Sequence, residues 1–231
     1  EEIQPELSVY SDQLNKKALE SAFLGELTEE GFFITIRGMK KSVEIFREEN
    51  IPIETQIQTK QTEYQSTTAA MTVNINGEEI TLPKAGDFLQ SPNRAIREEA
   101  WTKIAERRYQ DHEKLDALFN ELRDLRHQLA VNAGFLNFRD YMFAAMGRFD
   151  YTPQDCFNFH EAVAETVVPL VDEMVKERKI KLNVDELRPW DLKVDPDGKP
   201  ALKPFSNGED LLDKTVECFR RIDPKLADYI R

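Results

Sequence analysis

Apolar residues recur with a helical period along most of the chain. After Thr28 they return at steps of three and four, which places them on one stripe of a helix: Phe32, Ile36, Met39, Val43 and Phe46. Pro52 is expected to end this helix, because proline lacks the backbone N–H and restricts the residue before it. A further helix is predicted over residues 53–64.

The period changes to two over residues 71–82, MTVNINGEEITL, where apolar and polar residues alternate. Such alternation predicts strands, since successive side chains of a strand point to opposite faces. Asn76 and Gly77 stand at the centre and accept the left-handed angles of a type I′ turn. The segment is therefore predicted to be a β-hairpin.

A long helical segment is predicted from Ser91 and Pro92, where a capping hydroxyl precedes a proline suited to the first turn. It extends to Gly134, a typical stop, as one long helix or two coaxial ones. Its leucines also step by three and four: Leu115, Leu118, Leu122, Leu125 and Leu129. Another helix is expected to begin at Asn137. Thr152 and Asp155 then predict a capping box for a helix that is kinked at Pro169.

The helical rhythm breaks over residues 183–205, which contain four prolines and the turn sequence DPDG. Short extended pieces and a reverse turn are expected there. Ser206 and Glu209 predict a capping box ahead of the next helix, and Asp223 and Pro224 predict the start of the last one.

The predicted fold is mainly α. It is a multi-helix lobe with long antiparallel helices, one small β-hairpin at about residues 71–82 and one extended proline-rich excursion at about residues 183–205. We divide the chain into an N-terminal helical segment with the hairpin, residues 1–90, and a helical portion, residues 91–231.

The 231 residues carry 31 Lys and Arg against 43 Asp and Glu, a net charge of −12. This balance argues against nucleic acid and membrane partners, since both would require a basic face. No run approaches the ~18 apolar residues of a membrane span, and no signal peptide is recognisable. Cys156 and Cys218 are predicted to be free thiols buried in helix faces, so the expected location is cytoplasmic.

Motifs for metal chemistry are incomplete. The string HEAVA at His160 is close to H-E-x-x-H, but Ala164 replaces the second histidine and a methyl group cannot coordinate a metal. His112 and Asp116, together with His127, support a weaker hypothesis of a metal-binding bundle. No nucleotide-binding loop or nucleophile motif is recognisable. We therefore predict no catalytic residue and no metal ligand in this chain.

The most unusual segment runs from Arg188 to Asp191. Arg188, Trp190 and Asp191 are candidate substrate-binding residues, because the indole offers an aromatic surface and the carboxylate a partner for a cation or an N–H. The alternative, which the residues favour, is that Trp190 anchors the irregular excursion onto the helical core.

Several strings, in this order, resemble the oligoendopeptidase F family of zinc metallopeptidases. The similarity covers roughly residues 14–229, upstream of the family's metal site, and is best over residues 63–101 and 132–205. The strings are EYQSTTAAMTVNINGEEITLPKAGDFLQSPNRAIREEAW, AGFLNFRDYMFAAMGRFDYTPQDCFNFHEAV, VVPLVDEM, LRPWDLKVDPDGKPALKPF and RIDPKLADYI.

The resemblance implies a mostly helical, two-lobed peptidase with a deep cleft that hydrolyses short peptides with one zinc. In that family the general base and two zinc ligands belong to H-E-x-x-H, and a downstream Glu completes the site. None of these can be assigned here, because the sequence holds no such motif. The resemblance therefore implies a fragment that forms one lobe and a cleft wall, is inactive alone and binds no zinc itself.

The ends of the chain agree with that expectation. The chain begins with Glu1, and its last predicted helix stops at Arg231 without Gly, Asn or Pro to end it. A longer protein is therefore expected, and surfaces exposed by truncation are expected to promote self-association. The alternative is a non-catalytic helical module that binds peptides or partner helices.

Overall fold

The structure is a computed structural model that describes residues 3–28 and 30–230. The mainly α fold expected from the sequence is confirmed. Its helices are α1 Ile3–Leu19, α2 Glu30–Ile45, α3 Ile51–Ala69, α4 Leu82–Asp87, α5 Arg94–Gln110, α6 His112–Asn132, α7 Phe138–Ala145, α8 Pro153–Leu182, α9 Gly208–Ile222 and α10 Pro224–Ile230; the strands are β1 Thr72–Ile75 and β2 Glu78–Thr81. Short 3-10 helices are η1 Leu24–Glu26, η2 Glu48–Asn50, η3 Phe88–Gln90 and η4 Pro189–Asp191.

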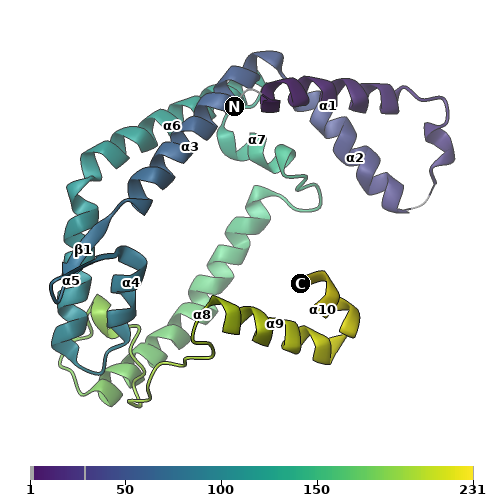
Figure 1. Cartoon of the computed structure of the whole chain (residues 1–231). Helices are drawn as coiled ribbons and strands as arrows, with labels where there is room; N and C mark the ends of the chain where they lie inside the picture. The colour runs from purple at the N-terminus through teal and green to yellow at the C-terminus, as the bar shows by residue number, and fades with distance from the viewer. Residues whose placement is uncertain (1–2, 29, 231) are drawn as a thin grey trace.

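The helices follow an open curve (Figure 1). The α1–α2 pair lies at one end, α3 and α6 run side by side, and the hairpin gathers with α4 and α5 at the other end. From α7, the long helix α8 runs back toward the end where α5 lies, and α9 and α10 pack on each other. No helix within the described ranges is long and apolar enough to cross a membrane.

The hairpin forms as predicted. β1 and β2 pair antiparallel, with Val73 opposite Ile80. Asn76 and Gly77 have φ angles of 55° and 82°, the left-handed values that the turn requires. The side-chain Oδ1 of Asn74 accepts a hydrogen bond from the Gly77 N–H at 3.1 Å and closes the turn.

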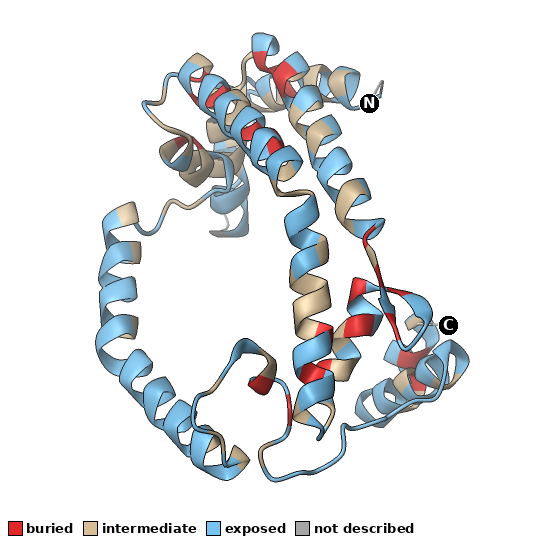
Figure 2. Cartoon of the chain, turned by 90° about the vertical axis from the view of Figure 1, so that its left-hand side faces the viewer, coloured by how far each residue is buried: buried red, intermediate tan, exposed pale blue. Residues whose placement is uncertain are grey.

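Buried residues gather in two clusters (Figure 2). The first joins the hairpin, α4 and η3 to α5: Met71, Val73, Ile75, Ile80, Leu82, Ala85, Leu89 and Ala100. The second joins α3, α6 and α7: Ile53, Leu129, Ala130, Ala133 and Tyr141. The first cluster therefore contains residues from both sides of position 90, while the division into segments 1–90 and 91–231 stays a prediction.

Several helix boundaries differ from those predicted. Pro52 does not end the first of these helices: α2 ends at Ile45, and Pro52 lies in the first turn of α3. The cap of α5 is Asn93, whose side chain accepts the Ala95 N–H, and not Ser91. In contrast, the division of this segment into two helices, which meet at Asp111, agrees with one of the two predicted alternatives.

At α9 the predicted capping pair of Ser206 and Glu209 is also wrong. Asn207 caps the helix by accepting the Asp210 N–H at 2.9 Å. In contrast, the capping box of Thr152 and Asp155 at α8 is confirmed.

The long helix α8 has no buried residue among its 30 and follows a curved course (Figure 2). Pro169 lies inside it, and the helix continues through this position. Cys156 on α8 is half-buried and Cys218 on α9 is exposed, so the predicted burial of both thiols is wrong.

Candidate functional site

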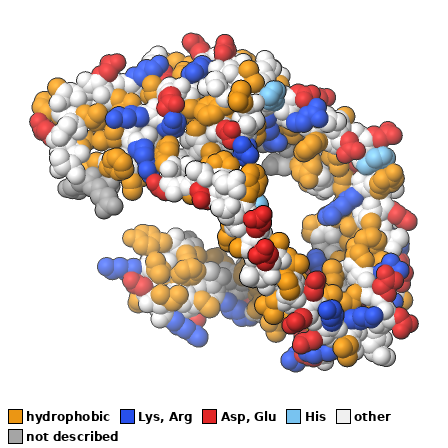
Figure 3. Space-filling view, turned by 180° about the vertical axis from the view of Figure 1, so that it is seen from behind, with side chains coloured by type: hydrophobic (Ala, Val, Ile, Leu, Met, Phe, Trp, Pro, Cys, Tyr) orange, Lys and Arg blue, Asp and Glu red, His pale blue; other side chains and the backbone are white. Residues whose placement is uncertain are grey.

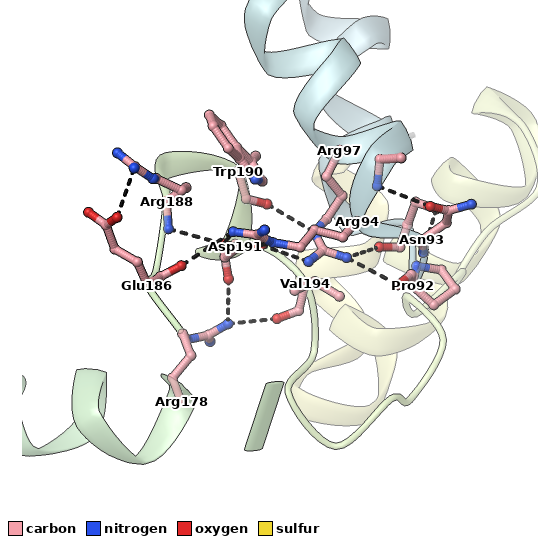
Figure 4. A network of polar contacts seen from close by, with 12 residues as sticks. Pro92, Asn93, Arg94, Arg97, Arg178, Glu186, Arg188, Trp190, Asp191 and Val194 are labelled. Atoms are coloured by element: carbon pink, nitrogen blue, oxygen red, sulfur yellow. Dashed lines mark hydrogen bonds and ion pairs between the residues drawn. The ribbon is translucent and has the colours of Figure 1, made fainter. Parts of the chain in front are cut away.

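Asp191, at the end of η4, is the centre of the polar network shown in Figure 4. Its side chain is completely buried. Two guanidinium groups of α5 pair with it: Arg94 Nη2 lies 2.9 Å from Oδ2, and Arg97 Nη2 lies 2.8 Å from Oδ1. The backbone N–H of Arg188 donates to Oδ2 at 3.0 Å. A buried carboxylate is stable only with this kind of pairing.

Arg97 is the buried cation of the network, with 3% of its surface exposed. Besides Asp191, its guanidinium donates to the carbonyl oxygens of Trp190 at 3.0 Å, Ser91 at 2.9 Å and Pro92 at 3.1 Å. The planar group thus joins the start of α5 to the excursion that follows α8.

Two further arginines fix the excursion. Arg178, on α8, donates to the carbonyl oxygens of Asp191 at 3.2 Å and Val194 at 2.7 Å. Arg94 also donates to the carbonyl oxygen of Glu186 at 3.3 Å. Residues 186–194 are therefore held by hydrogen bonds from both α5 and α8.

Trp190 packs against the first buried cluster. Its ring lies 5.5 Å from that of Trp101 on α5, and the Arg94 guanidinium lies over it at 5.9 Å. The indole Nε1 is buried and has no hydrogen-bond acceptor among the described residues.

The electrostatics follow from this geometry. Burial raises the pKa of Asp191, but the hydrogen bonds from Arg94, Arg97 and the Arg188 N–H favour the charged form more strongly. The net effect lowers the pKa of Asp191 to about 2. The carboxylate is therefore ionised at any physiological pH.

The three candidate substrate-binding residues lie together but in different environments. Asp191 is buried and its oxygens are engaged within the chain, Trp190 is half-buried, and the Arg188 side chain pairs with Glu186 near the surface at 2.7 Å. This arrangement supports the interpretation that Trp190 and Asp191 anchor the excursion. Peptide contact by these residues stays a prediction. Sequence reasoning missed Arg94, Arg97 and Arg178, whose roles carry no local sequence signal.

The histidines that the sequence offers as metal ligands lie on α6 and α8. Across residues 3–28 and 30–230, no three His, Cys, Asp or Glu side chains gather in a way that could hold a metal ion. His112, Asp116 and His127, the residues of the hypothetical bundle site, are therefore not gathered into such a cluster. His112 instead stacks on Tyr109, with ring centroids 4.2 Å apart, and His160 is exposed on α8.

Solved structures share this fold. An assigned oligoendopeptidase F matches with a TM-score of 0.90 and 21% identity, over 99% of this chain and 40% of its own. PZ peptidase A, solved with an inhibitor, matches with a TM-score of 0.90 and 20% identity, over 99% and 41%. An assigned oligoendopeptidase F from Bacillus anthracis gives 0.87 and 21%, over 98% and 41%. The chain therefore spans about 40% of the length of these structures.

The family follows from the sequence itself. The model of peptidase family M3 matches residues 88–221, which is more than half of the chain and includes the whole Asp191 network. The chain belongs to peptidase family M3. Among curated proteins none matches the chain significantly.

Proposed function

We propose that this chain forms one lobe and part of the cleft wall of a zinc-dependent oligoendopeptidase that cleaves short peptides in the cytoplasm, and that it is inactive alone. One observation carries the proposal. The fold agrees over 99% of this chain with peptidase structures of which it covers only 40%. The sequence also holds no H-E-x-x-H.

Uncovered apolar surface supports the same proposal. Large apolar side chains of α8 remain exposed along its length: Phe157, Phe159, Val167, Val168, Leu170, Val171, Met174, Val175 and Ile180. Hydrophobic side chains also gather on the arm formed by α9 and α10 (Figure 3). Exposed apolar patches of this extent mark surfaces that pack on other protein. In the proposed peptidase they pack against its remaining part.

We propose that the zinc of such a peptidase is held outside this part of the chain. Since the described residues form no three-ligand cluster, they do not fit the metal, and we assign none of them as a ligand. We propose that this lobe instead positions the wall along which the peptide lies.

Within that wall, Trp190 and Arg188 are the proposed peptide contacts. Trp190 is half-buried, so part of its ring is open to a peptide, and its indole N–H has no acceptor among the described residues. Asp191 acts by holding the segment. In the complete peptidase, Trp190→Phe, which keeps the ring, should raise KM several-fold more than it lowers kcat.

Peptide hydrolysis tests the proposal. The 231-residue chain and the longer product of its gene are assayed on a quenched fluorescent peptide library with zinc, with and without a chelator. We expect chelator-sensitive cleavage from the longer product only. Efficient chelator-sensitive cleavage by the 231-residue chain contradicts its inactivity. A gene that ends after Arg231 or encodes no downstream H-E-x-x-H contradicts the peptidase proposal and favours the non-catalytic helical module.

A further inference from the structure

A pocket of about 260 Å³ lies where α1, α2, α3 and α7 meet, far along the chain from the Asp191 network. Most of its lining side chains are polar, and they include two carboxylates, Asp12 of α1 and Glu54 of α3, and the hydroxyl of Tyr141 from α7. Nothing in the proposed function accounts for polar groups gathered at this junction of helices.

Asp12 is the unusual member. Only 7% of the residue is exposed, and it is the one buried residue of α1. Its Oδ2 pairs with Lys16 Nζ at 2.6 Å. Its Oδ1 is buried and has no hydrogen-bond partner among the described residues. A buried charged oxygen without a donor is costly, so this atom favours a donor-bearing ligand.

Glu54 supplies a second acceptor. Its carboxylate forms no ion pair or hydrogen bond with the residues that the structure describes, and burial raises its pKa. Glu54 and Tyr141 line the same pocket, and burial together with the nearby charge of Glu54 raises the pKa of Tyr141. Part of Glu54 stays exposed, so a cation can reach its carboxylate from solvent and pair with it.

The positive groups at the pocket are already engaged. The Arg47 guanidinium donates to three backbone carbonyl oxygens, those of Asn132, Glu44 and Phe46. Lys16 is half exposed and contacts the other oxygen of Asp12. The described residues offer no three-ligand cluster here for a metal ion, which makes an organic cation the better fit.

A groove adjoins the pocket and shares two of its lining residues. Glu54 and Tyr141 also line a depression of about 550 Å³ between α3, α6 and α7. Its other lining residues are largely apolar and include Ile57, Phe138 and Met142. A ligand whose charged end lies at Asp12 can therefore place an apolar body in this groove.

We propose that this pocket binds a protonated primary amine, with its ammonium group at Asp12 and Glu54 and its apolar or aromatic body in the adjoining groove. An ammonium group has three N–H donors, which match Asp12 Oδ1, the Glu54 carboxylate and the Tyr141 hydroxyl oxygen. Two sources carry this chemistry, a free amine and the N-terminus of a peptide.

Calorimetric titration of the 231-residue chain tests the site. Phenethylamine is compared with phenethyl alcohol, which has the same body without the charge, and Phe-Ala is compared with N-acetyl-Phe-Ala. We expect each amine to bind at least about tenfold more tightly than its uncharged partner. The tighter of the two amines identifies the source. Equal binding within both pairs overturns the proposal.

Variants locate the site. Asp12→Asn and Glu54→Gln should each weaken amine binding about tenfold or more, while the matched control Glu6→Gln, an exposed carboxylate of the same helix, should leave it unchanged. Lys16→Met should strengthen binding, because it frees the second oxygen of Asp12. This increase also tests the site if Asp12→Asn fails to fold. Unchanged binding in Glu54→Gln and Lys16→Met refutes the assignment.

Discussion

Replacing Asp191 with Asn tests whether the buried ion pairs hold the excursion in place. The substitution keeps the size of the side chain and removes its charge. Arg97, only 3% exposed, is then left without its carboxylate partner. Arg94 is 41% exposed and regains water, so its loss is small.

The expected cost comes mainly from Arg97. Breaking a buried ion pair by removing one partner costs about 3–5 kcal/mol, and the remaining amide oxygen of Asn favours the lower end. In a chain of this size, this lowers the melting temperature by roughly 6–12 °C. The matched control is Glu186→Gln, since Glu186 pairs with Arg188 at the surface and its loss should cost less than about 1 kcal/mol.

Urea unfolding followed by circular dichroism measures both variants. A double-mutant cycle with Arg97→Met should show that the two substitutions cost less together than the sum of each alone, because they remove the same pair. If Asp191→Asn is no more destabilising than Glu186→Gln, the network does not stabilise the fold and the argument fails.

The same variant has a pH signature. The folded-state pKa of Asp191, about 2, lies below its ordinary value of 3.8. A lowered pKa stabilises the folded state above the ordinary value, and this stabilisation is lost as the pH falls through the folded-state value. The difference in unfolding free energy between the parent chain and Asp191→Asn should therefore be constant above 3.8 and narrow toward about 2. A difference that widens in acid contradicts this account.

Three further predictions concern local features. Thr152→Ala removes the capping box of α8 and should cost about 1 kcal/mol, seen as faster hydrogen exchange in the first turn of that helix. Gly77→Ala places a Cβ at φ 82° and should cost about 1–2 kcal/mol in urea unfolding, whereas an unchanged midpoint would contradict the turn assignment. Leu170→Gln with Met174→Gln, at positions 58% and 62% exposed, should reduce self-association in sedimentation and binding of a hydrophobic dye. A parent chain that is monomeric and binds no dye would contradict that last expectation.

Local sequence determined much of the fold. The capping box of Thr152 and Asp155 and the turn at Asn76 and Gly77 depend on groups within three residues of one another, so their pattern is sufficient to predict them. The spacing of the leucines also identified a packed face of α6, since Leu118, Leu122 and Leu129 are buried.

The sequence did not show which of two neighbouring residues caps a helix. Ser91 and Asn93 are both suitable caps, as are Ser206 and Asn207. At the first site the Ser91 carbonyl oxygen accepts a hydrogen bond from Arg97, which fixes the chain path there, and Asn93 caps the helix. The sequence pattern alone does not distinguish these two caps.

The helical periodicity also predicted that both thiols are buried, which the structure contradicts. Cys156 and Cys218 lie on helices with apolar patterns, yet one is half-buried and the other exposed. A helical period identifies the face that packs on something, but it does not say whether the partner belongs to the same chain. The exposed apolar face of α8 illustrates the same limit.

The sequence by itself determined the helical class, the hairpin and the family resemblance, because these depend on periodicity, short-range hydrogen bonds and ordered strings. Only the tertiary structure decided the role of Asp191 and the pocket at Asp12. Asp191 meets Arg94 and Arg97 across more than 90 residues of chain. Asp12, Glu54 and Tyr141 line one pocket from three separate helices. The burial and pairing of a charged side chain are properties of such distant contacts, and no local pattern records them.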